Sequence, residues 1–211
     1  AVLTSKIKAA RHAVALDEER PTFRATLFGR ERVAELVALA NKDRPSPYLH
    51  WEQPYQEKWF PGTHGAVGGG GAHRGLSDGA LLWVLNGARR AGLELRNDND
   101  ARTFLIAPNS LDFVHNQAAR TIWEHGIFGW LRRLPHSPRQ GPADVDELAL
   151  ATFQRWFAAS GTLPGGQLYR PGALRALAGA IGQWPFANQP EMKSEHIVQQ
   201  GDTLSKLARH Y

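Results

Sequence analysis

One short stretch limits the fold of this 211-residue chain more than any other, a strand-like run that stops at a histidine and a glycine-rich turn. Tyr55–Phe60 reads as a short strand, and Pro61-Gly62 ends it, so that His64 stands just beyond the strand end. Five of the seven residues from 65 to 71 are glycine. Glycine permits positive φ and close backbone approach, at an entropic cost that an ordinary surface loop has little reason to carry. The stretch therefore predicts a functional turn directly after a strand, with His64 partly buried at the C-terminal edge of the sheet and the glycines at 68–71 close by.

The residues after the glycine-rich turn predict a helix, with signals for its start, its apolar face and its end. Ser77 is a suitable N-cap residue, and Asp78 falls in the first turn, where the helix dipole favours an anion. Apolar residues then recur at helical spacing, two arginines fall in the last turn, and Gly92 fits the position just after the helix end. Strand, histidine, glycine turn and helix in this order form the layout of an active site. In α/β hydrolases the general-base histidine lies on a loop after a late strand.

The same residues resemble the histidine-loop signature of the phospholipase-like α/β hydrolases found among type VI secretion effectors and their bacterial relatives. The residues that carry this resemblance are WFPGTHGAVGGGG (59–71) and RGLSDGALLWVLNGARRAGL (74–93). Two further segments agree in order, RHAVALDEER (11–20) upstream and YRPGAL (169–174) downstream, so the resemblance covers roughly residues 5–185. Many relatives carry Asp two residues after the histidine, where this chain has Ala66.

The resemblance implies a fold and a reaction. The fold is α/β, with residues 1–186 as the C-terminal part of an α/β-hydrolase-like domain, a mainly parallel sheet flanked by helices with helix-rich additions. The reaction is the serine-type hydrolysis of a carboxylic ester, such as a phospholipid, by a phospholipase-like or lipase-like effector with His64 as general base. In the family the nucleophilic serine and the catalytic Asp lie upstream of the segment that matches residues 11–20. Both are therefore expected outside this chain, in a missing N-terminal part of the same enzyme, and the chain alone is expected to be inactive.

Within the chain, Gly75-Leu-Ser-Asp-Gly79 is a literal match to the G-x-S-x-G nucleophile motif. A nucleophile elbow needs an apolar strand immediately before the serine, and here His73 and Arg74 stand close before it. We therefore expect Ser77 to cap a helix from Asp78 to about residue 91 and not to act as the nucleophile.

Apolar periodicity predicts further helices around this centre. Residues 3–19 are expected to form a helix that Pro21 ends, because Ile7, Ala10 and Val14 form an apolar stripe. The other helices are expected at residues 31–41, 144–158 and 171–181.

Composition and charge exclude several classes of protein and site. No apolar run approaches the length of a transmembrane helix, no signal-peptide pattern opens the chain, and the absence of cysteine excludes disulfides and a thiol nucleophile. The net charge of +5 comes from dispersed basic residues, so nucleic-acid binding is not favoured. Neither a metal nor a cofactor is expected. His64, His73 and His115 lack a zinc-binding spacing, and the acidic and amide residues at 97–100 do not fit the calcium loop of an EF-hand.

The end of the chain resembles a different module. Residues 187–195 have the composition of a linker, and residues 196–211 resemble the opening strand, turn and first helix of a LysM module, which binds glycans that contain N-acetylglucosamine. The glycan contacts that this resemblance implies, with peptidoglycan as partner, are Gly201, Asp202, Thr203 and Leu204. A second function therefore stays open, that of a non-catalytic peptidoglycan-binding protein of the cell wall. Both resemblances imply a bacterial protein, cytoplasmic before export and then delivered to the periplasm or cell envelope.

Overall fold

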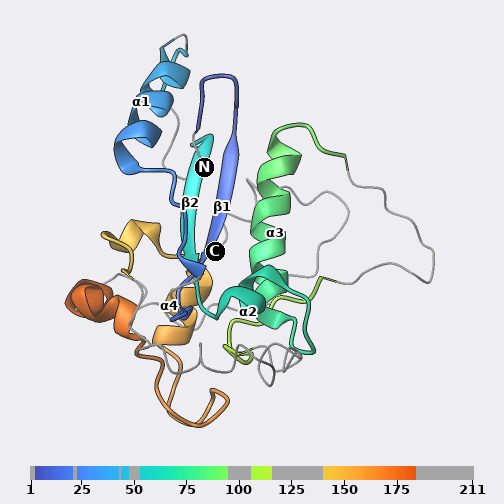
Figure 1. The fold of residues 1–211 in the computed structure, drawn as a ribbon, viewed down its shortest axis with the longest axis vertical. Helices are drawn as coiled ribbons and strands as arrows, with labels where there is room; N and C mark the ends of the chain where they lie inside the picture. The colour runs from blue at the N-terminus through green and yellow to red at the C-terminus, as the bar shows by residue number, and fades with distance from the viewer. Residues whose placement is uncertain are drawn as a thin grey trace, which may run out of the picture.

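A computed structural model describes residues 3–20, 23–42, 44–47, 53–94, 106–115 and 140–183 of the chain. At their centre lies a two-stranded parallel sheet (Figure 1). Strand β1, Ala10–Ala15, pairs with strand β2, Tyr55–Phe60, from Ala10 opposite Tyr55 to Ala15 opposite Phe60. The strand predicted at residues 55–60 is therefore confirmed, and the described part of the chain is a mixed α/β arrangement.

The helix predicted at residues 3–19 is wrong, because this segment contains β1. Val14 and Leu16 pack in one core cluster, whereas Ala13 and Ala15 pack in another. Alternate residues are thus buried on opposite faces of the sheet, which is a period of two and not of 3.6. A strand that is covered on both faces has apolar residues at consecutive positions, as residues 13–16 do here. The sequence therefore shows no alternation of apolar and polar residues that would indicate a strand.

Helix α1, Arg30–Asn41, lies in the connection between the two strands. Parallel neighbours cannot be joined by a tight turn, so they require a crossover of this kind. Leu36 of α1 packs with Leu3 and with Tyr55 of β2 in a small core cluster of their own. The helix predicted at residues 31–41 is confirmed.

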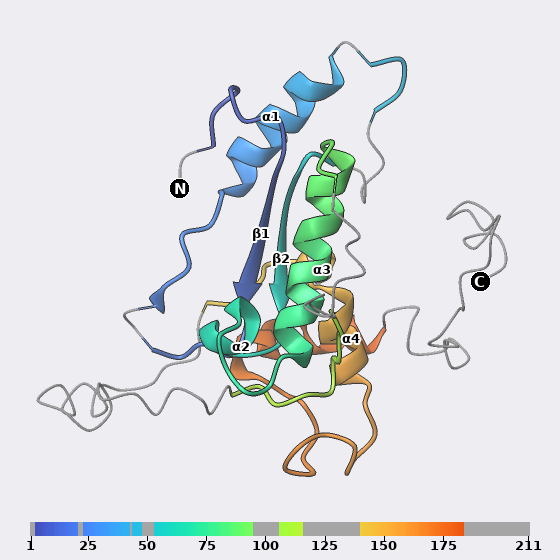
Figure 2. The same ribbon diagram turned by 90° about the vertical axis from the view of Figure 1, so that its right-hand side faces the viewer.

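Two helices follow β2. Helix α2 is short, His64–Gly68, and helix α3 spans Gly75–Arg90. In Figure 2, α3 runs alongside the two strands and α2 lies at their C-terminal end. Helix α3 ends as predicted, because Gly92 has a φ of +98° and Leu93 N donates to Ala88 O at 2.9 Å, which together form a Schellman motif.

The predicted role of Ser77 as N-cap of α3 is wrong. The helix begins earlier, with Arg74 at the N-cap position, and Ser77 lies in its first turn, where its Oγ donates to Arg74 O at 3.0 Å. A distant residue supplies the cap instead, because Asp112 Oδ2 accepts a hydrogen bond from Gly75 N at 2.8 Å. A carboxylate here satisfies a free N–H group and interacts favourably with the helix dipole.

The C-terminal part of the described chain packs against the edge of β2 that faces away from β1. Leu148 forms a parallel bridge with Trp59, and Ala149 N donates to Trp59 O at 2.9 Å. This extended contact splits the helix predicted at residues 144–158 into a 3-10 turn and a short helix. The elements here are η6 (Val145–Glu147), α4 (Leu150–Trp156), η7 (Gly172–Leu177) and α5 (Ala178–Gly182). The helix predicted at residues 171–181 is thus present as η7 followed by α5.

Both faces of the sheet are covered. The main core cluster joins the strands to the C-terminal elements and includes Leu16, Trp59, Phe153, Leu174 and Ile181. On the opposite face, Ala15 and Phe60 pack with Val67 of α2 and Ala80 of α3. Coverage on both faces is the usual environment of a parallel sheet.

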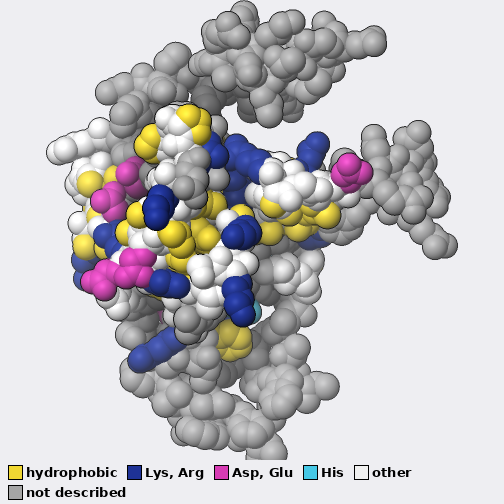
Figure 3. Space-filling model, turned by 90° about the horizontal axis from the view of Figure 1, so that it is seen from above, with side chains coloured by type: hydrophobic (Ala, Val, Ile, Leu, Met, Phe, Trp, Pro, Cys, Tyr) yellow, Lys and Arg dark blue, Asp and Glu magenta, His cyan; other side chains and the backbone are white. Residues whose placement is uncertain are grey.

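The N-terminal end of β1 carries a basic surface. A cavity of about 750 Å³ lies there, and the charged side chains that line it are Lys8, Arg11, Arg44 and Arg90. Seen from above, hydrophobic side chains gather on this face among Lys and Arg side chains (Figure 3). This surface is therefore at the opposite end of the strand from α2 and His64.

Several predictions lie outside the described residues. They concern the polar turn at residues 97–100, the linker at 187–195 and the LysM-like segment at 196–211, with its glycan contacts Gly201, Asp202, Thr203 and Leu204. Within the described ranges, no helix is long and apolar enough to cross a membrane.

Candidate functional site

His64 lies where the sequence predicted, directly beyond the end of a strand. β2 ends at Phe60, residues 61–63 turn the chain, and His64 opens α2 at the C-terminal edge of the parallel pair. Its side chain is exposed, whereas we expected it to be partly buried. The difference arises because α2 starts beyond the sheet edge, where few side chains reach the imidazole. The ring packs against Phe23, with 5.0 Å between the ring centroids, and has no polar partner among the described residues.

Three consecutive backbone N–H groups of the histidine loop, residues 61–64, donate to distant parts of the chain. The three bonds are Gly62 N to Asp17 Oδ2 (2.6 Å), Thr63 N to Val114 O (2.9 Å) and His64 N to Glu18 Oε2 (3.1 Å). Gly62 also has a φ of +117°, and an added Cβ would lie only 2.9 Å from the Cβ of Ala66. Position 62 therefore requires glycine, both for its conformation and for the space.

Asp17, which follows β1, connects the histidine loop to the C-terminal part of the chain. Its Oδ2 accepts hydrogen bonds from Gly62 N and from the hydroxyl of Tyr169, the latter at 2.7 Å. Burial of the carboxyl raises the pKa of Asp17, although these two hydrogen bonds and the charge of Arg155 act against the rise. Burial and the neighbouring Asp17 also raise the pKa of Tyr169 well above its usual value. The hydroxyl therefore stays protonated and continues to donate to Asp17.

Glu18 is 2% exposed, and its carboxylate accepts hydrogen bonds from two other residues. Arg20 donates from its backbone N at 2.9 Å, from Nε at 2.7 Å and from Nη2 at 2.8 Å, and His64 N donates the fourth bond. Burial alone would raise the pKa of Glu18, but the bonds from Arg20 and His64 outweigh it and hold the pKa at about 2. Glu18 is therefore ionised at neutral pH, with its charge at the first residue of α2.

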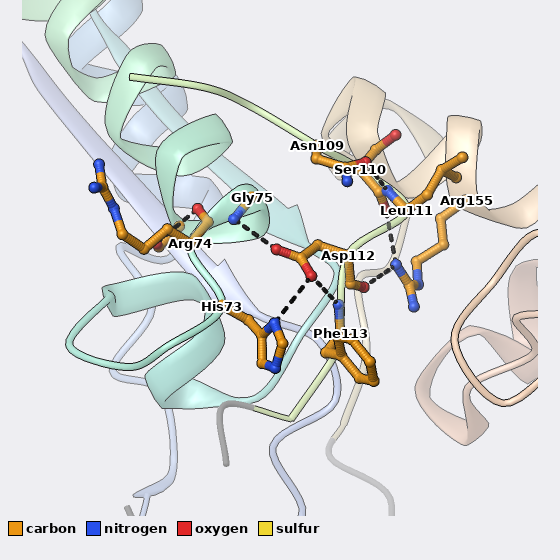
Figure 4. A network of polar contacts seen from close by, with 10 residues as sticks. His73, Arg74, Gly75, Asn109, Ser110, Leu111, Asp112, Phe113 and Arg155 are labelled. Carbon is orange, nitrogen blue, oxygen red and sulfur yellow. Dashed lines mark hydrogen bonds and ion pairs between the residues drawn. The ribbon is translucent and has the colours of Figure 1, made fainter. Parts of the chain in front are cut away.

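Residues 106–115 join α3 to α4 (Figure 4). Asp112 caps α3 through Gly75 N, and its other oxygen lies 3.5 Å from His73 Nδ1. Arg155 of α4 donates from Nη1 to two carbonyl oxygens of the segment, at 2.6 and 2.7 Å. Because Val114 of the same segment also holds the histidine loop, α3, α4 and the loop are fixed relative to one another.

A cavity of about 870 Å³ lies along the outer edge of β1 and includes His64 in its lining. Its other walls come from residues 12–15, 23–26, 67–71 and α3 as far as Val84. On this edge β1 has no neighbouring strand in the described part of the chain. Leu81 and Val84 of α3 line the cavity and are each 37% exposed. The cavity therefore combines an apolar wall, a strand edge and the predicted catalytic histidine.

Ser77 lines the same cavity, but its surroundings are not those of a nucleophile elbow. It lies inside α3, no strand leads into it, and its Oγ is engaged with Arg74 O. As for metals, no group of three or more His, Cys, Asp or Glu side chains that could hold an ion occurs in the described ranges. His64, His73 and His115 therefore form no such group.

The sequence did not identify the residues that support the histidine loop. The resemblance includes residues 11–20, 59–71 and 169–174 but gives no reason why these three segments should lie together. In the structure they meet at Asp17, which accepts hydrogen bonds from both Gly62 and Tyr169. One available signal was the run of three acidic residues, 17–19, directly after the apolar run at residues 13–16. Acidic residues that directly follow a strand lie at the sheet edge where functional groups gather.

Comparison with protein families agrees with the resemblance for the first part of the chain. Residues 1–87 match the model of the T6SS phospholipase effector Tle1-like catalytic domain, a region that holds β1, β2, the histidine loop and most of α3. No curated protein and no solved structure matches the chain. The family match ends well before residues 196–211, so the comparisons give no support to a LysM-like module there. Residues 1–87 are thus similar to the catalytic domain of type VI secretion phospholipase effectors, which supports a phospholipase-type or esterase-type hydrolase at the level of the family.

Proposed function

We propose that the chain is the histidine-bearing part of a serine-type carboxylic ester hydrolase that acts on phospholipids, with His64 as its general base. The observation that carries the proposal is the position of His64 at the C-terminal end of a parallel strand, beside a glycine turn and a cavity. This position falls within the part of the chain that matches the phospholipase effector catalytic domain. The general base of an α/β hydrolase occupies a loop of this kind. Ala66 supplies no polar group where many relatives of the family have Asp.

The proposed mechanism follows from the chemistry of a histidine base. His64 takes the proton of a serine hydroxyl as the serine oxygen attacks the ester carbonyl, and then gives this proton to the leaving alcohol. Water repeats the two steps on the acyl-enzyme and releases the carboxylic acid. An imidazole without a polar partner in the described part of the chain is compatible with a serine on one ring nitrogen and a carboxylate on the other.

The nucleophilic serine and the acid come, in this proposal, from an N-terminal part of the same enzyme outside residues 1–211. The outer edge of β1 supports this arrangement, since a cavity of about 870 Å³ with an apolar wall lies along it. Parallel sheets covered on both faces normally have more than two strands. A further strand parallel to β1 in this position would end next to His64, at the edge where the ligands of α/β sheets bind.

The match to a type VI secretion effector family fits a bacterial origin and delivery to a target cell or its envelope. An enzyme delivered there would meet phospholipid as its substrate. Glycan binding by residues 196–211 stays a prediction, and a peptidoglycan pull-down with the full-length protein tests it.

The test of the proposed function compares three proteins on a short-chain nitrophenyl ester and on phospholipid vesicles: residues 1–211 alone, the full-length protein and its His64→Ala variant. Loss of a triad member costs on the order of 10⁴-fold or more in rate. The fragment and the His64→Ala variant should therefore lie near background, while the full-length protein turns over. His115→Ala is the matched control, because it removes another exposed imidazole and should leave turnover unchanged.

Equal turnover by the full-length protein and its His64→Ala variant would contradict the role of His64. Inactivity of the full-length protein on every ester, together with binding to peptidoglycan, would favour the cell-wall-binding alternative.

A further inference from the structure

We infer that Asp17 and Glu18, the first two of the three carboxylates that follow β1, are positioning residues for His64. They hold the backbone of the histidine loop, and none of their hydrogen bonds among the described residues goes to the imidazole. The inference rests on the proposed role of His64 as general base and adds the residues that fix its place.

The acidic pair holds the histidine loop at two points. Asp17 Oδ2 accepts from Gly62 N at 2.6 Å, and Glu18 Oε2 accepts from His64 N at 3.1 Å. Successive side chains of a regular strand point to opposite faces. The chain bends at Leu16 and Asp17, however, and both carboxyl groups reach the same loop. The loop after β2 is thus fixed to the end of β1.

Each carboxylate is also held from a second direction. The buried Tyr169 hydroxyl donates to Asp17 Oδ2 at 2.7 Å, and Arg20 donates three N–H groups to Glu18. Glu18 is buried, and either carboxylate would lose hydrogen bonds to partners on two sides if it changed its rotamer. The two carboxylates are therefore rigid supports.

The position of the His64 backbone decides where its ring lies, because the ring has few contacts of its own. Phe23 is its one aromatic neighbour in the described part of the chain. Proton transfer requires the base within hydrogen-bonding distance of the nucleophile, and a displacement of about 1 Å can cost on the order of 100-fold in rate. A loop held at Gly62 and at His64 meets this requirement with an otherwise exposed imidazole.

The experiment uses the full-length protein and a soluble nitrophenyl ester, with kcat and KM measured for Asp17→Ala, Asp17→Asn and Glu18→Ala. Both alanine variants should lower kcat by about 10- to 100-fold. Their KM should stay within about twofold of wild type, because a positioned base acts in the transition state and not in substrate binding. Asp17→Asn keeps an oxygen that accepts from both Gly62 N and Tyr169, so it should recover most of kcat. Glu19→Ala is the matched control, since it removes the exposed neighbouring carboxylate and should leave kcat and KM unchanged.

Thermal unfolding and amide hydrogen exchange of each variant separate positioning from a loss of folded protein. Folded alanine variants with kcat within about twofold of wild type would overturn the inference, as would an Asp17→Asn variant no better than Asp17→Ala. An activity loss that only follows the folded fraction would overturn it as well. If an alanine variant does not fold, Tyr169→Phe decides, because it removes one of the two bonds to Asp17. A several-fold fall in kcat at constant KM supports the inference, and an unchanged kcat contradicts it.

His64→Ala, measured in parallel, separates this inference from the proposed function. Full turnover by His64→Ala means that the proposed function fails. Loss of turnover in His64→Ala, with wild-type kcat in the folded Asp17→Ala and Glu18→Ala variants, means that only the positioning role fails.

Discussion

The two edges of the sheet differ in what covers them. At the β2 edge the chain continues the sheet with Leu148, which bridges Trp59, and the surrounding core includes Leu174, which is 0% exposed. At the β1 edge there is a cavity of about 870 Å³, lined by Leu81 and Val84 of α3.

This difference separates the two tasks of the molecule. Residues 140–183 pair with β2 at Trp59 and supply much of the main core cluster. His64 lies between the two edges: Asp17 and Tyr169 tie its loop to the β2 side, and its ring lines the cavity at the β1 edge. One edge therefore stabilises the fold, and the other is where we expect the remaining catalytic groups.

The largest expected effect is at the β2 edge, with Trp59→Ala. Trp59 is 2% exposed and lies in the main core cluster, so its loss should reduce the free energy of unfolding by about 3–5 kcal/mol. Urea unfolding followed by circular dichroism measures this change. A cost below about 1 kcal/mol would mean that the β2 edge is not the stable side of the molecule.

The histidine loop lies between the two edges, and its attachment to Glu18 should make the stability of the fold sensitive to acid. Its folded-state pKa of about 2 lies below the ordinary value of 4.5, so its stabilising contribution is complete above pH 4.5 and is lost as the pH falls towards 2. The contribution at neutral pH is on the order of 2 kcal/mol, after allowance for the half-exposed Arg20 side chain. Unfolding free energies of wild type and Glu18→Gln should therefore converge as the pH is lowered from 5 to 2. If Glu19→Gln changes the pH dependence of the unfolding free energy in the same way, the cause is surface charge and not the contact of Glu18 with the histidine loop.

Ser77→Ala tests the wall of the cavity at the β1 edge. Ser77 is 8% exposed, and its Oγ donates to Arg74 O, so the substitution should cost about 1 kcal/mol or less. Full-length Ser77→Ala should keep its esterase activity, because this hydroxyl is bonded inside α3. Covalent labelling of Ser77 by a fluorophosphonate would show instead that the nucleophile lies within this chain.

The smallest effect is expected for Leu81→Ser in residues 1–211. Leu81 is 37% exposed at the β1 edge, and such a change should alter the free energy of unfolding by about 0.5 kcal/mol or less. In the full-length protein the same substitution should cost on the order of 1–2 kcal/mol if a further strand covers this side chain. Equal small effects in both proteins would indicate that the β1 edge stays open.

The sequence predicted best where its signals are local. The strand stop at Pro61-Gly62, the place of His64 and the end of α3 at Gly92 depend on residues next to one another, and all three are confirmed. The start of α3 was misplaced because its cap, Asp112, lies 37 residues from Gly75.

The other failures have the same origin in long-range contacts. β1 read as a helix because both faces of the strand are covered, which removes the alternation of apolar and polar residues. The predicted helix at residues 144–158 is interrupted because Leu148 pairs with Trp59, and the residues around Leu148 do not predict this distant contact. The supports of the histidine loop come from positions far apart in the sequence, so spacing alone did not group them.

The same separations set the order in which the histidine loop is completed during synthesis. Its three tertiary hydrogen bonds span 45, 46 and 51 residues, and the bond from Tyr169 to Asp17 spans 152. Contacts of high sequence separation form slowly, and a ribosome releases the chain from its N-terminus. A nascent chain that ends before Val114 cannot fix Thr63, and one that ends before Tyr169 leaves Asp17 held from one side only. The proposed general base therefore reaches its final position late, after most of the described chain has left the ribosome.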